Sequence, residues 1–276
     1  MAGGFIIGGF QISRNLAPYP GAAIDADVAA FAAESGATDV AGLNNLVKYL
    51  KAESIYDNFV IYPMKSAQNA GSGATVYSLG GLTTNDMTLV NSPTWGAGGI
   101  TTNGTNQYGY VPDFLGSQTR TVFGRTNLTL GMPGTDPILA TYGTSTSNRG
   151  WILGINVASG TLLFRSSDGT NGNQEIYNTP DTSAAGTDTC VVGQWIEGGG
   201  RSAWHNKTSQ SLSLLAGSAQ TGVFNTTNPL TFSALLDSDL TTTINTSQLT
   251  GIAMAVCNQA ITTAQRETIT DLINAL

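Results

Sequence analysis

The spacing of apolar positions between residues 38 and 64 changes from that of a helix to that of a strand. Four apolar residues fall at i, i+3, i+4 and i+7 of one helix stripe: Leu43, Leu46, Val47 and Leu50. Asp39 stands where an N-cap residue would accept bonds from the first turn. The β-branched and aromatic residues 59–62 then predict a strand that ends at Pro63. We therefore expect helices before residue 58 and a β domain after it.

A shorter amphipathic stretch precedes this helix, over residues 25–34. Asp25 is placed to cap it, and Ile24, Val28 and Phe31 share a face at spacings of four and three. Ser35-Gly36 ends the stretch. Two amphipathic helices with a tight connection predict an αα-hairpin over residues 23–57. Its apolar stripe can pack on the β domain or on a partner.

Residues 1–22 alternate glycine with large apolar side chains and contain Pro18 and Pro20, which favours an extended arm. The apolar residues expected to anchor this arm in a partner are Phe5, Ile6, Ile7 and Phe10. The alternative is a tail that folds back on its own domain. The stretch has no positively charged n-region, so we expect it to belong to the mature protein rather than to a secretory signal.

Short strands separated by Gly, Asn, Pro and Thr recur from residue 59 onward. The pattern predicts them at Ala74–Leu79, Met87–Val90, Gly99–Thr102, Tyr108–Val111, Arg120–Asn127, Ile138–Tyr142, Gly150–Val157, Thr161–Arg165, Gln174–Asn178, Thr189–Ile196, Ser202–His205, Leu212–Leu215, Leu230–Ala234 and Gln248–Cys257. No helices interleave with them as in βαβ units, so the pattern favours an antiparallel sandwich over a parallel sheet.

The C-terminal segment predicts a central strand followed by a short helix. Residues 251–257 form a continuous apolar run, typical of a strand covered on both faces. Thr262 and Gln265 then fit a capping box. The apolar stripe of the closing helix is Ile269, Leu272, Ile273 and Leu276.

Composition narrows the classes of function. Charged residues make up 11% of the 276 residues, against roughly 25% in typical soluble proteins. Such a surface suits a protein fixed in an assembly or facing glycans, and equally a secreted β protein. The net charge of −7 argues against nucleic-acid binding and against an anionic membrane surface. No apolar run approaches the roughly 20 residues that span a bilayer.

The two cysteines, Cys190 and Cys257, are too few for a disulfide framework. Each lies in an apolar run, where a buried free thiol is expected. A disulfide between them stays open as an alternative.

Three stretches resemble a segment of structural proteins of tailed bacteriophages that leads into a concanavalin A-like (laminin-G-like) jelly roll. They are Asp25–Met64, with its Asp-Ala-Asp and Leu-Val-Lys-Tyr-Leu passages; Ile100–Phe114, with its Asn-Gly-Thr-Asn turn; and Ile252–Cys257 with the helix after it. The resemblance covers most of residues 23–276 and leaves out the N-terminal arm. It implies a mainly β, two-sheet antiparallel jelly roll in a virion surface protein, such as a capsid decoration, head fibre or tail fibre.

The residues of an enzyme on this fold are not evident. Glycoside hydrolases on the jelly roll need paired carboxylates, about 5–5.5 Å apart for retention, and neither Glu175 nor Glu197 has an acidic partner at i±2 or i±4. His205 is the only histidine and no Gly-x-Ser-x-Gly elbow is present, so a Ser–His–Asp triad is not indicated. We predict no catalytic residues and no enzyme activity.

Two oxygen-rich loops are weak candidates for calcium. Asp168 opens the loop 168–173, and Asp237 and Asp239 have alternate spacing after an apolar pair. Hard cations take several carboxylate and carbonyl oxygens, but turns explain both segments as well. We expect no other cofactor.

Glycan binding needs a stacking aromatic ring beside planar polar groups. Our candidates are Asn103, Asn106, Tyr108 and Tyr110, with Trp95, Trp151, Trp195 and Trp204 as further aromatics. The alternatives are that the tryptophans fill the core and that the asparagines form a turn.

Taken together, the sequence predicts an anchoring arm (1–22), a helical hairpin (23–57) and a jelly roll (58–276). We expect a non-enzymatic protein located in the virion, with other virion proteins and host-surface glycans as partners, and a homo-oligomeric state. A carbohydrate-active enzyme and a secreted lectin or adhesin on the same fold are the alternatives.

Overall fold

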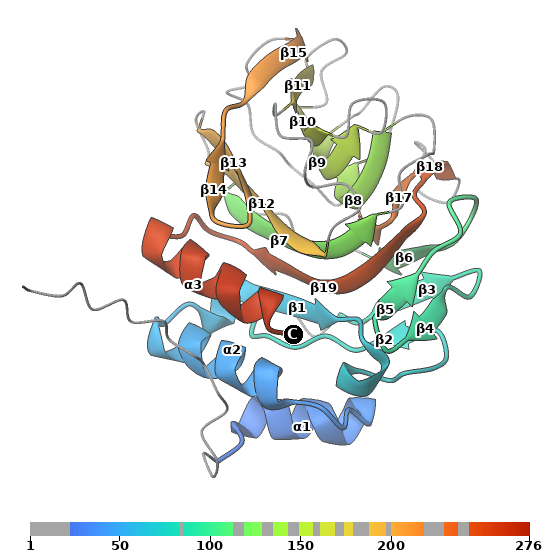
Figure 1. The fold of residues 1–276 in the computed structure, drawn as a ribbon, viewed down its shortest axis with the longest axis vertical. Helices are drawn as coiled ribbons and strands as arrows, with labels where there is room; N and C mark the ends of the chain where they lie inside the picture. The colour runs from blue at the N-terminus through green and yellow to red at the C-terminus, as the bar shows by residue number, and fades with distance from the viewer. Residues whose placement is uncertain are drawn as a thin grey trace, which may run out of the picture.

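A computed structural model gives the fold of the chain. It describes residues 23–82, 85–112, 119–128, 135–142, 149–156, 161–168, 174–178, 188–196, 200–217, 229–236 and 243–276. The architecture is an antiparallel, concanavalin A-like sandwich of two sheets, with two helices on the outer face of one sheet and a third packed on one of them (Figure 1). This confirms the predicted fold class for the described residues. The proposed anchor residues Phe5, Ile6, Ile7 and Phe10 lie outside them.

The first helix, α1 (Ala26–Ser35), begins and ends as the sequence predicts. The Asp25 side chain accepts a bond from the backbone N–H of Asp27, at 3.0 Å, and Gly36 ends the helix in the left-handed region at a φ of 75°. Val28 and Phe31 are buried against the second helix, whereas Ile24 is 56% exposed. Ile24 therefore does not share in the packing of that face.

The second helix, α2 (Ala41–Ala52), buries all four residues of the predicted stripe. The prediction that Asp39 caps it is wrong. Val40 is the N-cap residue, and its apolar side chain has no acceptor for a cap bond. Asp39 is held one position before the cap, where the N–H groups of Thr38 and Asp39 both donate to the carbonyl of Ala67.

The strand β1 (Phe59–Pro63) pairs antiparallel with β19 (Leu249–Cys257), at the centre of the molecule. Alternate residues of β19 point to opposite faces. Met254 and Val256 enter the core between the sheets, and Ala255 and Cys257 face the helices. Every residue of β19 except Thr250 is buried, which confirms the prediction of a final strand covered on both sides.

Sheet A follows the order β14-β13-β12-β7-β19-β5-β4, with β1 alongside β19. Its other strands are β14 (Thr208–Gln210), β13 (Arg201–His205), β12 (Thr189–Trp195), β7 (Arg120–Leu128), β5 (Gly99–Thr101) and β4 (Thr94–Gly96).

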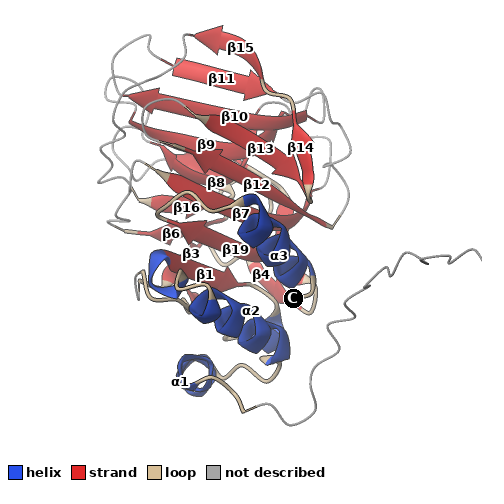
Figure 2. Cartoon of the chain, turned by 90° about the vertical axis from the view of Figure 1, so that its left-hand side faces the viewer, coloured by secondary structure: helices blue, strands red, loops and turns tan. Residues whose placement is uncertain are grey.

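Sheet B follows the order β15-β11-β10-β9-β8-β16-β6-β3-β2, and Figure 2 shows its strands from β15 to β3 stacked in this order. They are β15 (Ser213–Gly217), β11 (Gln174–Asn178), β10 (Thr161–Asp168), β9 (Arg149–Asn156), β8 (Thr135–Tyr142), β16 (Leu230–Phe232), β6 (Tyr108–Val111), β3 (Met87–Val90) and β2 (Thr75–Val76). A separate hairpin joins β17 (Ala234–Leu236) to β18 (Thr243–Thr246).

The structure adds four strands to those predicted. β4, β14 and β18 are short and lack an apolar run, and Ser233, at a φ of 65°, separates β17 from β16. Two short 3-10 helices, η1 (Tyr56–Asn58) and η2 (Ser66–Gln68), flank β1.

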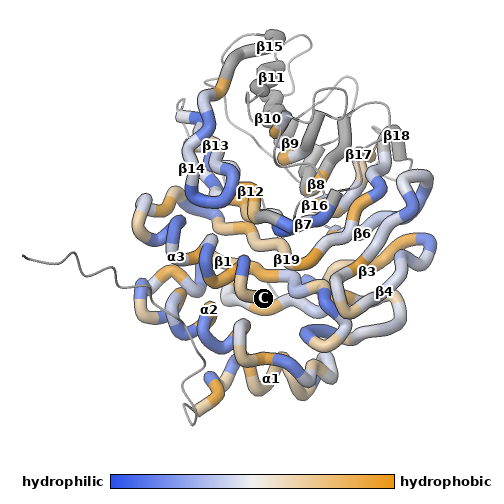
Figure 3. Tube along the Cα trace, viewed as in Figure 1, coloured by the Kyte–Doolittle hydropathy of each residue, from blue (hydrophilic) through white to orange (hydrophobic). Residues whose placement is uncertain are grey.

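Two hydrophobic cores hold the layers together. The first lies between the sheets, and Figure 3 shows hydrophobic residues along β19 and β12. The second lies between sheet A and the helices, where Phe123 of β7 and Phe59 of β1 approach with ring centroids 6.2 Å apart. Leu46 and Leu50 of α2 share this second core with Ile269 of the last helix, α3 (Thr263–Asn274). The stripe of the helical hairpin therefore packs on the sandwich, which decides between the two alternatives left open by the sequence.

α3 begins with the predicted capping box. The Thr262 hydroxyl accepts from the Gln265 N–H, and the Gln265 side chain accepts from the Thr262 N–H. Among the described residues, no helix has both the length and the apolar character needed to cross a bilayer.

Cys190 and Cys257 are both buried in the second core and both free. Burial raises the pKa of each thiol to about 12. Both side chains therefore act as small apolar residues in the packing.

Candidate functional site

The asparagines predicted to bind glycans are used within their own turn. Asn103 Oδ1 accepts bonds from the N–H groups of Thr105, Asn106 and Gln107, at 2.9, 3.2 and 3.2 Å, and its Nδ2 donates to Asn106 Oδ1 at 3.1 Å. Gln107 links this turn to the neighbouring loop by donating to the carbonyl of Ser92. The amide groups that a glycan would need are therefore already used in hydrogen bonds that build the turn.

Tyr108 and Tyr110 lie on the outer face of sheet B, on β6. Tyr108 is buried against Ala234 and Leu236, and Tyr110 is half-buried beside it. Burial, and then the neighbouring Tyr110, raise the pKa of Tyr108. The pair contributes at most one half-exposed ring, and the glycan role of this set stays a prediction.

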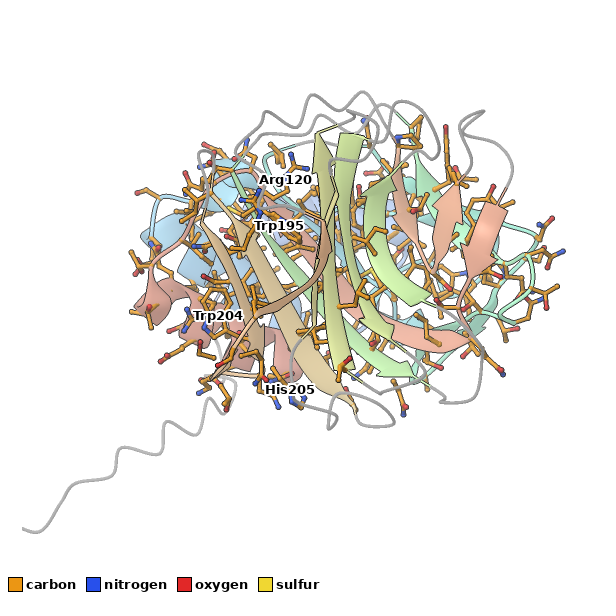
Figure 4. The ribbon with its side chains drawn as sticks, turned by 90° about the horizontal axis from the view of Figure 1, so that it is seen from above. Arg120, Trp195, Trp204 and His205 are labelled. Atoms are coloured by element: carbon orange, nitrogen blue, oxygen red, sulfur yellow. The ribbon has the colours of Figure 1, made fainter. Side chains whose placement is uncertain are left out.

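Three of the four tryptophans, Trp151, Trp195 and Trp204, are buried, as the alternative interpretation stated, whereas Trp95 is half-buried and donates to the carbonyl of Gly73. Trp151 and Trp195 pack with centroids 5.4 Å apart, and the Arg120 guanidinium lies 5.6 Å from the Trp151 ring. Arg120 and Trp195 are register partners on β7 and β12 and lie together in Figure 4. Burial lowers the pKa of Arg120 to about 9. Trp204, further along β13, is buried with Arg266 4.0 Å from its ring centroid.

Other predicted features are placed by the strands around them. His205 is buried in β13, opposite Val191 and Thr208. Asp168 is the last residue of β10, whereas Asp237 and Asp239 lie outside the described residues. Within the described ranges, no three His, Cys, Asp or Glu side chains are grouped so as to hold a metal ion.

A row of polar residues crosses the outer face of sheet A, and the sequence-based search missed it. Register partners connect Thr94 of β4 to Thr101 of β5, Thr101 to Thr250 of β19, and Thr250 to Asn127 of β7. Asp188 precedes β12, the next strand of the sheet. The alternation of each strand sets this face, because neighbours such as Ile100 and Leu249 point into the core between the sheets.

Three members of this row, Thr101, Thr250 and Asn127, line a hollow of about 360 Å³ together with Asp188, and we call this hollow the sheet A groove. Its lining consists of Gly96, Gly98, Gly99, Thr101, Asn127, Asp188, Thr250 and Ile252. The glycines of the β4–β5 turn let a ligand approach the backbone closely. Figure 1 shows α3 ending below the middle of β19, with β4 and β5 further along the same sheet.

The polar groups of the groove point to a ligand rich in hydroxyl groups. The Thr101 and Thr250 hydroxyls bond each other at 2.9 Å, so the pair retains one donor hydrogen and free acceptor lone pairs. Asn127 is exposed and, within the described part of the chain, its amide makes no hydrogen bond. Donors and acceptors of this kind match sugar hydroxyls.

Asp188 is held at the groove by Arg125 of β7. Arg125 Nε donates to Asp188 Oδ1 at 2.7 Å, and Nη2 donates to Oδ2 at 2.8 Å. Arg125 Nη1 also donates to the carbonyl of Ile273, in the last turn of α3, at 3.0 Å. The Asp188 side chain is 45% exposed, whereas that of Arg125 is 10% exposed. The Asp188 carboxylate is therefore accessible to a ligand in the groove, whereas the Arg125 guanidinium is largely buried beneath it.

A second hollow, of about 340 Å³, lies between α1 and the end of α2. Lys51 bonds Asp25 and Asp27 there, each at 2.6 Å, and lies 4.9 Å from the centroid of the Tyr56 ring. These partners are engaged with one another. The Lys51 ammonium in this hollow is therefore already neutralised by the two carboxylates.

Comparison with known proteins places the fold among lectin-like β-sandwiches. No family model matches the chain, and no curated protein is significantly similar to it. A mutant of Trypanosoma rangeli sialidase displaying trans-sialidase activity has a TM-score of 0.53 and 10% identity, covering 84% of this chain and 39% of its own. Trypanosoma rangeli sialidase in complex with sialic acid has a TM-score of 0.51 and 12% identity, covering 84% and 38%. Botulinum neurotoxin type C, solved in work on cell entry through two ganglioside molecules, has a TM-score of 0.54 and 9% identity, covering 80% and 53%.

At 9–12% identity these likenesses show the fold alone, an antiparallel β-sandwich. The chain spans about two fifths of the sialidase chains and about half of the toxin chain.

The prediction that this protein is not an enzyme is wrong, because it ruled out every enzyme activity on this fold. Structures that share the fold of this chain include sialidases. The absence of an acidic partner for Glu175 and Glu197 at i±2 or i±4 excludes one arrangement of catalytic residues. Because the same fold occurs in carbohydrate-active enzymes, that absence does not exclude enzyme activity altogether.

Proposed function

We propose that this chain is a surface protein of a tailed-phage particle, which binds host glycans through the sheet A groove. The observation that carries the glycan proposal is the row Thr101, Thr250 and Asn127, with Asp188 beside it, in a hollow that three glycines also line. In this proposal the jelly roll faces outward and the N-terminal segment attaches it to other virion proteins. Assembly as a homo-oligomer would multiply a weak single-site affinity.

Two further findings support glycan binding. The groove combines amide, hydroxyl and carboxylate groups in one hollow, and such groups fix sugar hydroxyls by directional bonds. Solved structures of the same fold include proteins described with sialic acid and with gangliosides. Both observations favour a carbohydrate ligand over a peptide or a nucleic acid.

The virion role is supported by the sequence and by how the hairpin is used. The stripe of α2 is buried on sheet A, so this stripe is not available to a partner. The strongly apolar residues 5–10 then remain as the segment suited to attachment. The low content of charged residues also suits a protein fixed in an assembly.

The proposal that glycans bind in the sheet A groove is tested by introducing a large side chain in the β4–β5 turn at the edge of the groove. Gly98 lines the groove and a Cβ added to it meets no heavy atom within 4 Å, so Gly98→Trp adds an indole at the groove with no clash at its Cβ. We expect binding to a printed glycan array, and to purified host-surface polysaccharide, to fall at least about tenfold.

The matched control is Ala97→Trp, which adds the same side chain to an exposed position of the same turn that does not line the groove. It should bind as the native protein does. Equal binding by Gly98→Trp would place the glycan elsewhere. Measuring free sugar in the same reactions shows whether the bound glycan is also cleaved.

The attachment role is tested by removing residues 1–22. We expect the shortened protein to keep the circular dichroism spectrum of the native one and to be missing from purified particles, as seen by cryo-electron microscopy and immunoblot. Because the groove lies in the sandwich, glycan binding of the shortened protein should not change. Incorporation at the normal level would overturn the anchoring role of Phe5, Ile6, Ile7 and Phe10.

A further inference from the structure

The charges around the sheet A groove lead to an inference about its ligand, which rests on the proposed function. Among the described residues that line the hollow, Asp188 is the charged one; the others are glycine, threonine, asparagine and isoleucine. Any ligand that lies on the row of threonines therefore meets a carboxylate at one end.

The cations near Asp188 are turned toward the protein. Arg125 uses Nε and Nη2 for the two carboxylate oxygens and Nη1 for the carbonyl of Ile273. Lys65 is half-buried and donates to the Leu276 carbonyl. Burial, and then the charge of Arg125, lower the pKa of Lys65. Neither cation lines the groove, so neither offers a bond to an acidic sugar there.

Asp188 keeps acceptor capacity despite its ion pair. Each carboxylate oxygen accepts one bond from Arg125, and the two oxygens of a carboxylate offer about four lone-pair sites in all. The remaining sites suit hydroxyl donors. A second carboxylate at the same place would be repelled by Asp188, and the whole chain, at a net charge of −7, adds to that repulsion.

We infer that the sheet A groove selects uncharged glycans and disfavours sialylated or otherwise acidic ones, with Asp188 as the residue that sets this preference. The groove thus differs in ligand class from proteins of the same fold that are described with sialic acid or gangliosides. Arg125 is a positioning residue that holds the carboxylate in place.

The test compares glycans that differ by one charged sugar. Lactose and N-acetyllactosamine are printed beside their 3′-sialylated forms, and apparent affinities are measured for the whole chain at low and at high salt. We expect the neutral member of each pair to bind at least about tenfold more tightly at low salt, and the difference to shrink at high salt. Equal or tighter binding of the sialylated member would overturn the inference.

Two variants assign the preference to Asp188. Asp188→Asn removes the charge while keeping the shape, and should bring the two members of a pair within about threefold of each other. Asn127→Asp adds a second carboxylate at the same end of the row, next to Asp188, and should widen the difference. Glu34→Gln on α1, which does not line the groove, removes the same unit of charge and should leave the preference unchanged.

The outcomes separate this inference from the proposed function. If glycans bind and Gly98→Trp abolishes binding, but both members of each pair bind alike, the groove is a glycan site and the inference is wrong. If the native protein binds none of the glycans, the proposed function fails and the inference falls with it. A preference that survives Asp188→Asn would also contradict the assignment to Asp188.

Discussion

Phe123→Ala should lower the free energy of unfolding by about 3–5 kcal/mol, the range for truncating a fully buried phenylalanine. Phe123 is 0% exposed, on the face of β7 that carries the helices, and its ring packs against that of Phe59. The substitution opens a cavity where sheet A, α2 and α3 meet. Thermal unfolding followed by circular dichroism should show one transition, lowered by on the order of 10 °C.

The single transition matters as much as the size of the shift. If α2 and α3 share one cooperative unit with the sandwich, helix and sheet signals are lost together. Tyr110→Ala is the matched control, because it truncates an aromatic ring that is half-buried on the outer face of sheet B. Tyr110→Ala should lower the free energy of unfolding clearly less than Phe123→Ala does. A loss for Phe123→Ala no greater than for Tyr110→Ala, or helices that melt apart from the sheets, would show that the second core is not a structural unit.

Gly99→Ala should destabilise the protein by about 3 kcal/mol or more, because two independent costs add. Gly99 has a φ of +132°, and backbone strain of this kind costs on the order of 1–3 kcal/mol. A Cβ at this position would also lie 2.1 Å from the Gly251 carbonyl oxygen on β19. Relieving that overlap requires β5 to move away from β19, which breaks the Thr101–Thr250 hydroxyl pair.

Gly98→Ala provides a control that differs by one position. Its Cβ meets no heavy atom within 4 Å and its φ is not in the left-handed region, so we expect a change within about 0.5 kcal/mol. Chemical denaturation of the two variants measures both values. Similar stabilities for Gly99→Ala and Gly98→Ala would show that the β4–β5 turn is not held against β19 as described.

The helices and most strands follow from local patterns. The α2 stripe, the Asp25 cap and the Thr262–Gln265 capping box are set by residues within four positions of one another, so the sequence predicts them directly. Strand ranges such as Met87–Val90 and Gln174–Asn178 match the structure for the same reason. Asp39 fails as a cap because of a long-range contact: Ala67 holds the backbone before α2.

The candidate site behaves differently. The amides of the Asn103 turn are close in sequence and drew attention, yet they bond one another. Thr101 and Thr250 are 149 positions apart, and each is an unremarkable threonine in a short strand. Because Ile100 and Leu249 point into the core, the alternation of a strand indicates that Thr101 and Thr250, which follow them, point out of it. No local rule, however, states which strands are neighbours.

The sequence by itself determined the mainly antiparallel β class, the helical hairpin, the closing strand and helix, and the strongly apolar N-terminal segment. These depend on periodicity, capping and turn residues, whose physical range is a few positions along the chain. The tertiary structure alone decided that the hairpin packs on sheet A, that Trp151, Trp195 and Trp204 are core residues, and that Asp188, Asn127 and two threonines share one groove. Those features depend on the order and register of the strands, which are set by burial and hydrogen bonding summed over the whole sandwich.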